Sequence, residues 1–153
     1  MKFAIVSDTH DNMANFNRAI GFLNKENITV MLHCGDICSQ TTIDEAQKSF
    51  KGGITFVRGN GDYQLEDILE TMDVELGGKK IALIHYPDKA MQLAQSRKYD
   101  LVFYGHTHRP WVEEIGDCRL VNPGEVAGQR FKPTFAIYDT EKDKLELKIL
   151  EKV

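Results

Sequence analysis

Five short segments of the chain place metal-ligand side chains directly after apolar stretches. They are Asp8-Thr9-His10, Gly35-Asp36, Gly59-Asn60-Gly61-Asp62, His85 and Gly105-His106-Thr107-His108. Carboxylate, imidazole and amide groups form a mixed oxygen and nitrogen set, which suits manganese, iron, zinc, nickel or cobalt better than calcium. Four of the five histidines lie in these segments. The sequence therefore predicts a transition-metal site.

The spacing within two of these segments supports one shared site. Asp8 and His10 are separated by one residue, and so are His106 and His108. On extended backbone, alternate side chains point to the same side, so either pair can reach a single ion. A single histidine at a strand end is usually structural, so the interpretation depends on all five segments occurring together.

The first half of the chain alternates between strand and helix patterns. Short apolar strands are expected at residues 3–7, 29–33 and 54–57, with amphipathic helices at 13–23 and 41–51 between them. This alternation is typical of a parallel sheet, whose strand ends are where sites form. We expect the metal-ligand segments to meet at that edge.

The second half contains more strands and at least one hairpin. Strands are expected at 72–76, 79–86, 100–104, 111–115, 119–122, 135–139 and 144–150. A helix that begins with proline is expected at 87–98, and residues 65–75 could begin as helix. The charged run at 141–144 reads as a hairpin turn. The predicted fold class is α/β, with two mixed β-sheets packed face to face and helices on the outside.

Composition limits the possible functions. With 153 residues, 42% hydrophobic and 27% charged, the chain has the size of a single domain, 1–153. The net charge of −4 leaves no broad basic surface for an extended nucleic acid. Cys34, Cys38 and Cys118 form no disulfide or zinc pattern, and we interpret the first two as small buried hydrophobes. We expect a cytoplasmic protein with no membrane contact.

The ordered motifs D-x-H, G-D, G-N-x-D, a strand-end histidine and G-H-T-H resemble the calcineurin-like metallophosphoesterase superfamily. Length and spacing are similar to those of its small YfcE-type phosphodiesterase branch. The resemblance extends from Asp8 through Gly105-His106-Thr107-His108-Arg109-Pro110 to Asn122-Pro123-Gly124. It implies a four-layer αββα sandwich and metal-dependent hydrolysis of phosphodiesters.

The resemblance also implies roles for seven residues. A first ion is held by Asp8, His10, Asp36 and His108, and Asp36 bridges to a second ion held by Asn60, His85 and His106. Two cations lower the pKa of a bridging water toward about 7, which supplies a hydroxide nucleophile. Asp36, Asn60 and His106 are the expected catalytic residues, because Asn60 and His106 also stabilise charge on phosphate oxygens. We expect two Mn²⁺ ions, with Ni²⁺, Fe²⁺, Co²⁺ or Zn²⁺ as alternatives.

Three positions depart from the family pattern. Gly61 stands where many family enzymes carry a histidine that protonates the leaving oxygen, Tyr86 where glycine is common, and Glu125 where serine is common. Without that histidine we expect a preference for activated or cyclic phosphodiesters. Tyr86 narrows the pocket or stacks on a base.

Alternative functions remain open at this point. The same centre would support a phosphomonoesterase or nucleotide phosphatase, which pocket shape would decide. A metal-free interaction scaffold ranks low, because all seven expected ligands are present. The expected partner is a small phosphodiester or phosphate-ester substrate, and a homo-oligomer is possible on sequence grounds.

Several neighbouring residues have two interpretations. His33 is expected to be structural or to support a ligand. Asp62 caps a loop or lies in the site, and Arg58 and Arg109 either contact phosphate or form solvated ion pairs.

Two further polar residues, Asp11 and Asn12, directly follow the first metal-ligand segment. Both are expected to cap the first helix rather than bind metal.

Overall fold

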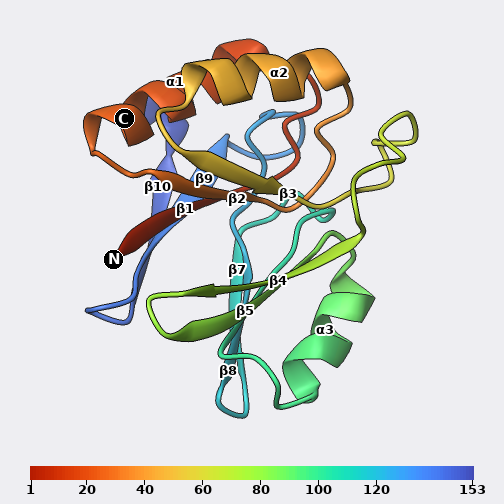
Figure 1. The fold of residues 1–153 in the computed structure, drawn as a ribbon, viewed down its shortest axis with the longest axis vertical. Coiled ribbons are helices and arrows are strands. Elements are labelled where there is room, and N and C mark those ends of the chain that lie inside the picture. Colours follow the sequence, from red (N-terminus) through yellow and green to blue (C-terminus); the bar gives the residue numbers. More distant parts are fainter.

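The computed structural model describes residues 1–153 and contains two five-stranded sheets (Figure 1). The first sheet has the order β10-β9-β1-β2-β3. Its strands are β1 (Lys2–Val6), β2 (Val30–His33), β3 (Gly53–Phe56), β9 (Thr134–Asp139) and β10 (Lys144–Ile149). β1, β2 and β3 are parallel, whereas β9 runs antiparallel to both β1 and β10. The sheet is therefore mixed, as expected.

The second sheet has the order β4-β5-β6-β8-β7. Its strands are β4 (Thr71–Leu76), β5 (Lys79–Ile84), β6 (Leu101–Phe103), β7 (Trp111–Ile115) and β8 (Cys118–Asn122). β5, β6 and β8 are parallel, and the hairpin partners β4 and β7 are antiparallel at the two edges. The expected β4–β5 hairpin is confirmed.

Helices cover the outer face of each sheet. α1 (Met13–Lys25) and α2 (Gln40–Ser49) lie over the first sheet, α3 (Pro87–Gln95) lies against the second, and a short 3-10 helix, η1 (Leu150–Lys152), ends the chain (Figure 1). Pro87 occupies the start of α3, where its missing N–H has no helical partner to lose. The four-layer αββα arrangement is confirmed. None of these helices is long and apolar enough to cross a membrane.

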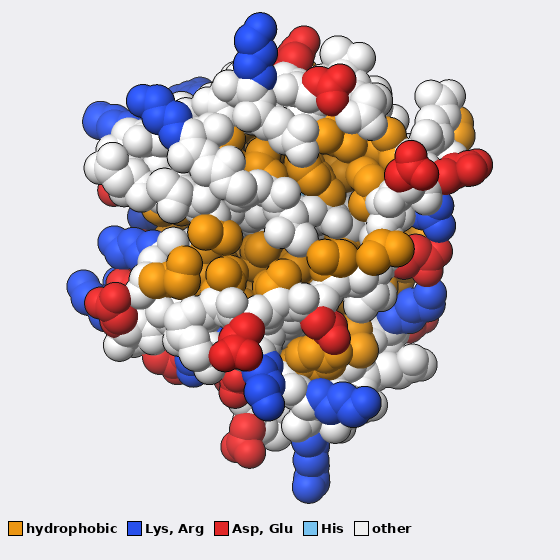
Figure 2. All heavy atoms as spheres, viewed as in Figure 1, with side chains coloured by type: hydrophobic (Ala, Val, Ile, Leu, Met, Phe, Trp, Pro, Cys, Tyr) orange, Lys and Arg blue, Asp and Glu red, His pale blue; other side chains and the backbone are white.

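Alternation along β1 explains how one strand serves two layers. Phe3 and Ile5 pack between the sheets, whereas Ala4 and Val6 pack beneath α1. All four side chains are fully buried, which explains the continuous apolar run in the sequence. Figure 2 shows a band of apolar side chains at the level between the two sheets, with charged side chains above and below it.

The segment between β3 and β4 contains turns and no helix. Leu65 N–H donates to Asp62 O and Ile68 N–H to Leu65 O, which are isolated turn bonds. Arg58 N–H donates to Leu69 O, so the far end of the segment returns to the end of β3. The helix suggested for residues 65–75 is therefore wrong, because cross-segment bonds replace helical ones.

The helix caps agree only partly with expectation. Asn12 caps α1 by accepting a hydrogen bond from Asn15 N–H. Asp11 instead accepts from the hydroxyls of Ser39 and Thr42, both at 2.6 Å, at the start of α2. The assignment of Asp11 to the first helix is wrong, because the loop after β1 passes beside the start of α2.

Candidate metal centre

The metal-ligand segments follow the carboxyl ends of parallel strands in both sheets. Asp8 and His10 follow β1, Asp36 follows β2, and Asn60 follows β3. The other three residues, His85, His106 and His108, follow β5 and β6 of the second sheet. Side chains from the two sheets meet here, and the structure brings all seven predicted residues together.

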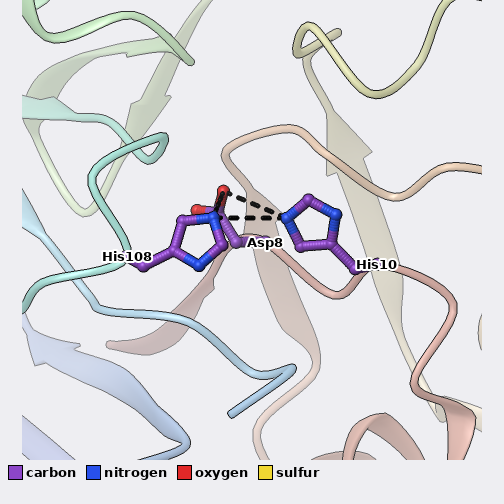
Figure 3. Close-up of side chains that lie close together, drawn as sticks. All are labelled: Asp8, His10 and His108. Atoms are coloured by element: carbon purple, nitrogen blue, oxygen red, sulfur yellow. Dashed lines mark hydrogen bonds and ion pairs between the residues drawn. The ribbon is translucent and has the colours of Figure 1, made fainter. Parts of the chain in front are cut away.

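Asp8, His10 and His108 form one cluster, shown in Figure 3. Each offers one ligand atom, and these atoms lie within 4.8 Å of one another. His108 Nε2 is 3.3 Å from Asp8 Oδ1 and 3.3 Å from His10 Nε2. Two imidazole nitrogens that point at one carboxylate oxygen match the donor set of a divalent transition metal.

A second cluster surrounds Asp36 and shares Asp8 with the first. His85 Nε2 is 3.4 Å from Asp36 Oδ1 and 3.1 Å from Asn60 Oδ1. Asn60 Oδ1 is also 2.8 Å from His106 Nδ1. The amide oxygen of Asn60 thus faces two imidazoles.

One carboxylate oxygen in the centre makes no hydrogen bond to the protein. Asp8 Oδ2 accepts hydrogen bonds from the Ser7 hydroxyl at 2.6 Å and the His106 amide at 3.2 Å. Asp8 Oδ1 is buried and makes no hydrogen bond. Such a charge is costly unless it is paired or coordinates a cation, so the residues fit a metal ion at this point.

Other groups hold the Nδ1 atoms of His85 and His108, which leaves Nε2 of these two rings facing the centre. His85 Nδ1 is 2.7 Å from Cys34 O, and His108 Nδ1 is 2.9 Å from Glu125 Oε2. A proton on Nδ1 in each ring leaves the Nε2 lone pair free for a cation.

Glu125 contacts a ligand-type histidine, which the sequence analysis missed, because it noticed only the departure of Glu125 from the family pattern. The side chain is fully buried and accepts hydrogen bonds from the amides of Gln129, Arg130 and Phe131 at 2.6–2.8 Å. Burial alone would raise the pKa of Glu125, but these amides and His108 lower it below its ordinary value. Glu125 therefore joins a ligand-type histidine to the loop after β8 as a carboxylate.

Asp62 and His33 are structural. The Asp62 carboxylate accepts hydrogen bonds from the amides of Asp36, Gly59 and Cys38 at 2.7–2.8 Å and so joins two loops of the centre. His33 lies 2.8 Å from Thr9 Oγ1, and complete burial lowers its pKa to about 3. His33 is therefore neutral, as a structural role requires.

The first cluster shifts the pKa values of its own members. Burial alone would raise the pKa of Asp8, but the ion-pair contact with His10, whose Nε2 is 3.7 Å from Asp8 Oδ1, holds it below its ordinary value together with His85, the Ser7 hydroxyl and His108. The same contact with Asp8 raises the pKa of His10, more than burial lowers it. Asp8 thus favours the positive charge on His10, as it would favour a cation.

Close backbone approach requires glycine at two positions. A Cβ at Gly59 would lie 2.2 Å from Asp36 Oδ1, and one at Gly105 would lie 2.0 Å from Ser7 Oγ. These glycines allow the loops to pass directly beneath the ligand-type carboxylates.

The remaining flanking residues have different roles. Arg58 forms an ion pair with Glu70 at 3.4 Å, whereas the Arg109 guanidinium lies 5.4 Å from the centroid of the Trp111 ring. Cys34 is buried, as expected.

Cys38 is only half-buried, and its Sγ is 3.5 Å from His10 Nδ1. The interpretation of Cys38 as a buried hydrophobe is wrong, because its loop turns back toward His10.

The chain matches the calcineurin-like phosphoesterase superfamily domain over residues 1–143. Phosphodiesterase MJ0936 of Methanocaldococcus jannaschii is 36% identical over 167 aligned residues, covering 99% of this chain and 100% of that protein. A solved structure of an archaeal phosphodiesterase superposes with a TM-score of 0.89 at 34% identity, covering 97% of this chain and 99% of that one.

The solved structure of YfcE, a phosphoesterase from E. coli, has a TM-score of 0.72 at 19% identity and covers 98% of this chain and 100% of that one. At this identity the likeness to YfcE concerns the fold. The family match and the relative of 36% identity both extend over nearly the whole chain, including every ligand-type segment. The chain belongs to the calcineurin-like phosphoesterase superfamily and is a metal-dependent phosphoester hydrolase.

Proposed function

We propose that the protein is a dinuclear metal-dependent phosphodiesterase that hydrolyses small or activated phosphodiesters. Asp8, His10, Asp36 and His108 hold one ion, and Asp36, Asn60, His85 and His106 hold the other. We propose Mn²⁺ as the metal and the cytoplasm as the location. The relatives named phosphodiesterases support the reaction class, and the geometry of Asp36 supports the dinuclear centre.

The position of the Asp36 carboxylate carries this proposal. Its Oδ2 is 3.5 Å from His10 Nε2, and its Oδ1 is 3.4 Å from His85 Nε2. Each oxygen therefore faces a histidine of a different cluster. Two nearby cations repel each other unless an anionic group lies between them, and Asp36 is placed to be that group.

The chemistry divides between the metals and the exposed residues. Two bound cations would acidify a water molecule for attack and neutralise charge on the phosphate. Asn60 and His106 are exposed, whereas four of the other ligand-type residues are buried: Asp8, Asp36, His85 and His108. Asn60 and His106 can therefore contact the non-bridging phosphate oxygens from the solvent side.

The residue after Asn60 limits the leaving group. Gly61 has no side chain to protonate a departing oxygen, and its N–H donates to Asp36 Oδ1 at 2.7 Å. Good leaving groups need no such proton, so we expect aryl or cyclic diesters to react faster than alkyl diesters. Equal rates for an aryl and an alkyl diester would contradict this preference.

The first test is hydrolysis of bis-p-nitrophenyl phosphate by metal-stripped protein, with and without added Mn²⁺. We expect Mn²⁺-dependent turnover in the wild type. Turnover should disappear in Asp36→Asn, whose amide keeps the shape but lacks the negative charge. Folded wild-type protein that shows no turnover with Mn²⁺, Ni²⁺, Co²⁺ or Zn²⁺ would refute the proposal. Faster hydrolysis of p-nitrophenyl phosphate would favour a phosphomonoesterase.

A further inference from the structure

Tyr86 lies on the open side of the candidate metal centre. Its ring centroid is 5.7 Å from that of His106, with the two ring planes tilted by 52°, and 5.3 Å from that of His85. Tyr86 is the N-cap residue of α3, and its half-buried side chain makes no capping hydrogen bond to that helix. The phenol ring thus extends the wall formed by two ligand-type histidines.

A substrate has to approach the centre from this side. Asp8 and His85 are fully buried, whereas Asn60 and His106 are exposed. A phosphate that reaches the centre past Asn60 and His106 would bring an ester group toward Tyr86, whose ring centroid is 5.7 Å from that of His106. Ring faces bind planar ring systems by stacking.

Two cations accompany the ring and share one carboxylate. Lys89 Nζ lies 5.7 Å from the centroid of the Tyr86 ring and 3.2 Å from Glu70 Oε2. Arg58 is 3.4 Å from the other Glu70 oxygen. The group Arg58, Glu70 and Lys89 therefore carries one net positive charge beside Tyr86. This charge attracts the anionic phosphodiester to which such a ring is attached.

We propose that Tyr86 is a specificity residue that binds a planar aromatic ring on the retained arm of the phosphodiester. The net positive charge of Arg58, Glu70 and Lys89 attracts the diester as a whole. This inference rests on the proposed function and adds a substrate class to it: diesters with one aromatic arm, supplied by an aryl group or by a nucleobase.

The test compares diesters that share the p-nitrophenolate leaving group and differ in the retained arm. Methyl p-nitrophenyl phosphate carries no retained ring, the phenyl ester carries an aryl ring, and thymidine 5′-(p-nitrophenyl phosphate) carries a nucleobase. For each Mn²⁺-loaded variant, kcat/KM on an aromatic diester is divided by kcat/KM on the methyl diester. Intrinsic reactivity cancels when this ratio is compared between variants.

Tyr86→Leu keeps an apolar side chain without a ring, and Tyr86→Phe keeps the ring. We expect the ratio for at least one aromatic diester to fall about tenfold in Tyr86→Leu, mainly through KM, and to be retained in Tyr86→Phe. A fall for the thymidine ester assigns a nucleoside arm, and a fall for the phenyl ester alone assigns an aryl arm. An unchanged ratio in Tyr86→Leu would overturn the proposal.

Lys89→Met separates charge from ring recognition. It should lower kcat/KM by the same factor on all three diesters and leave the ratio unchanged. A Lys89→Met variant with a changed ratio and a Tyr86→Leu variant without one would assign the selectivity to Lys89 and overturn the proposal.

Binding of non-hydrolysable ligands tests the ring contact apart from catalysis. Calorimetry on Mn²⁺-loaded protein would compare phenylphosphonate with methylphosphonate. We expect the wild type and Tyr86→Phe to prefer the phenyl compound, and Tyr86→Leu to lose the preference. Wild-type protein that shows this preference without hydrolysing any diester would keep the ring site and refute the proposed function. Equal binding of both phosphonates by the wild type would refute the ring site.

Discussion

Replacing Glu125 by glutamine should weaken metal binding without removing any of the seven ligand-type residues. Glu125 Oε2 accepts from His108 Nδ1 and Gln129 N–H, and Oε1 accepts from the amides of Arg130 and Phe131. A glutamine amide replaces one of these oxygens with an NH₂ group. In either orientation of the glutamine amide, its NH₂ group faces two of the N–H donors that the carboxylate had bound.

The size of the effect follows from this count. Hydrogen bonds to a charged acceptor contribute about 1.5–3 kcal/mol each, so losing two costs about 3 kcal/mol of stability or more. Loss of the carboxylate that orients a metal-binding histidine typically lowers metal affinity about 10-fold to 100-fold. Both effects are expected in Glu125→Gln, because the same carboxylate holds the loop and His108.

Two assays on the same samples separate these effects. Denaturant unfolding of the metal-stripped protein gives the stability loss, and calorimetric titration with Mn²⁺ gives the affinity. Glu75→Gln is the matched control, because Glu75 is exposed on β4. If Glu125→Gln unfolds more easily but binds Mn²⁺ like the control, Glu125 holds only the loop. If both values match the control, the reasoning fails.

Three further predictions concern the metal centre and the residues around it. At a hundred times its dissociation constant, Mn²⁺ should raise the free energy of unfolding by about 2.7 kcal/mol, and a chelator should reverse this gain. A melting temperature that changes with neither Mn²⁺ nor chelator would argue against the site. Gly105→Ala should abolish the Mn²⁺ binding measured by calorimetry, because the added Cβ would lie 2.6 Å from Asp8 Oδ2. The control Gly21→Ala adds a Cβ in open space on α1 and should raise the free energy of unfolding by about 0.5–1 kcal/mol. The pKa of His33 is about 3 in the folded protein and about 6.5 in the unfolded chain. The contribution of neutral His33 to the free energy of unfolding is therefore complete above pH 6.5, and it declines toward pH 3 because the unfolded chain takes up the proton first. As the pH falls from 6.5 to 3, the free energy of unfolding of the metal-stripped wild type should therefore decrease by up to about 1.4 kcal/mol per pH unit more than that of His33→Asn. Parallel pH profiles of the two proteins would exclude this role.

Local sequence patterns were enough to locate the elements and the candidate site residues. The all-apolar run of β1 reflects a strand with buried side chains on both faces, and the metal-ligand segments follow strand ends as expected. The strand order was not predictable in the same way. β9 and β10 return to the first sheet, and β9 pairs with β1 across more than a hundred residues of sequence. The hydrophobic periodicity within a strand does not show which of the two sheets the β9–β10 hairpin joins.

The supporting residues were hidden for a related reason. Glu125 acts on His108, 17 positions earlier, and on amides that become available only when the loop after β8 has folded. Asp62 likewise acts on the amides of Asp36 and Cys38, which belong to another loop. A side chain that binds backbone amides leaves almost no signature in its partners' identities, because every residue except proline supplies an N–H. Ligands are visible in sequence by their type, but their supports are not.

Backbone strain explains why such supports are needed. Five of the seven ligand-type residues have positive φ values: Asp8 (51°), His10 (46°), Asp36 (57°), His106 (70°) and His108 (62°). Each costs about 1 kcal/mol in a residue other than glycine, so the total of roughly 5 kcal/mol is comparable with the whole stability of a small domain. The buried Asp62 carboxylate holds one of these loops by accepting the Asp36 amide, and Glu125 holds the His108 imidazole while it accepts the amides of its own loop. A cation at Asp8 Oδ1, which accepts no hydrogen bond, would add to that stabilisation, so the strained backbone, the supporting carboxylates and this oxygen are parts of one arrangement.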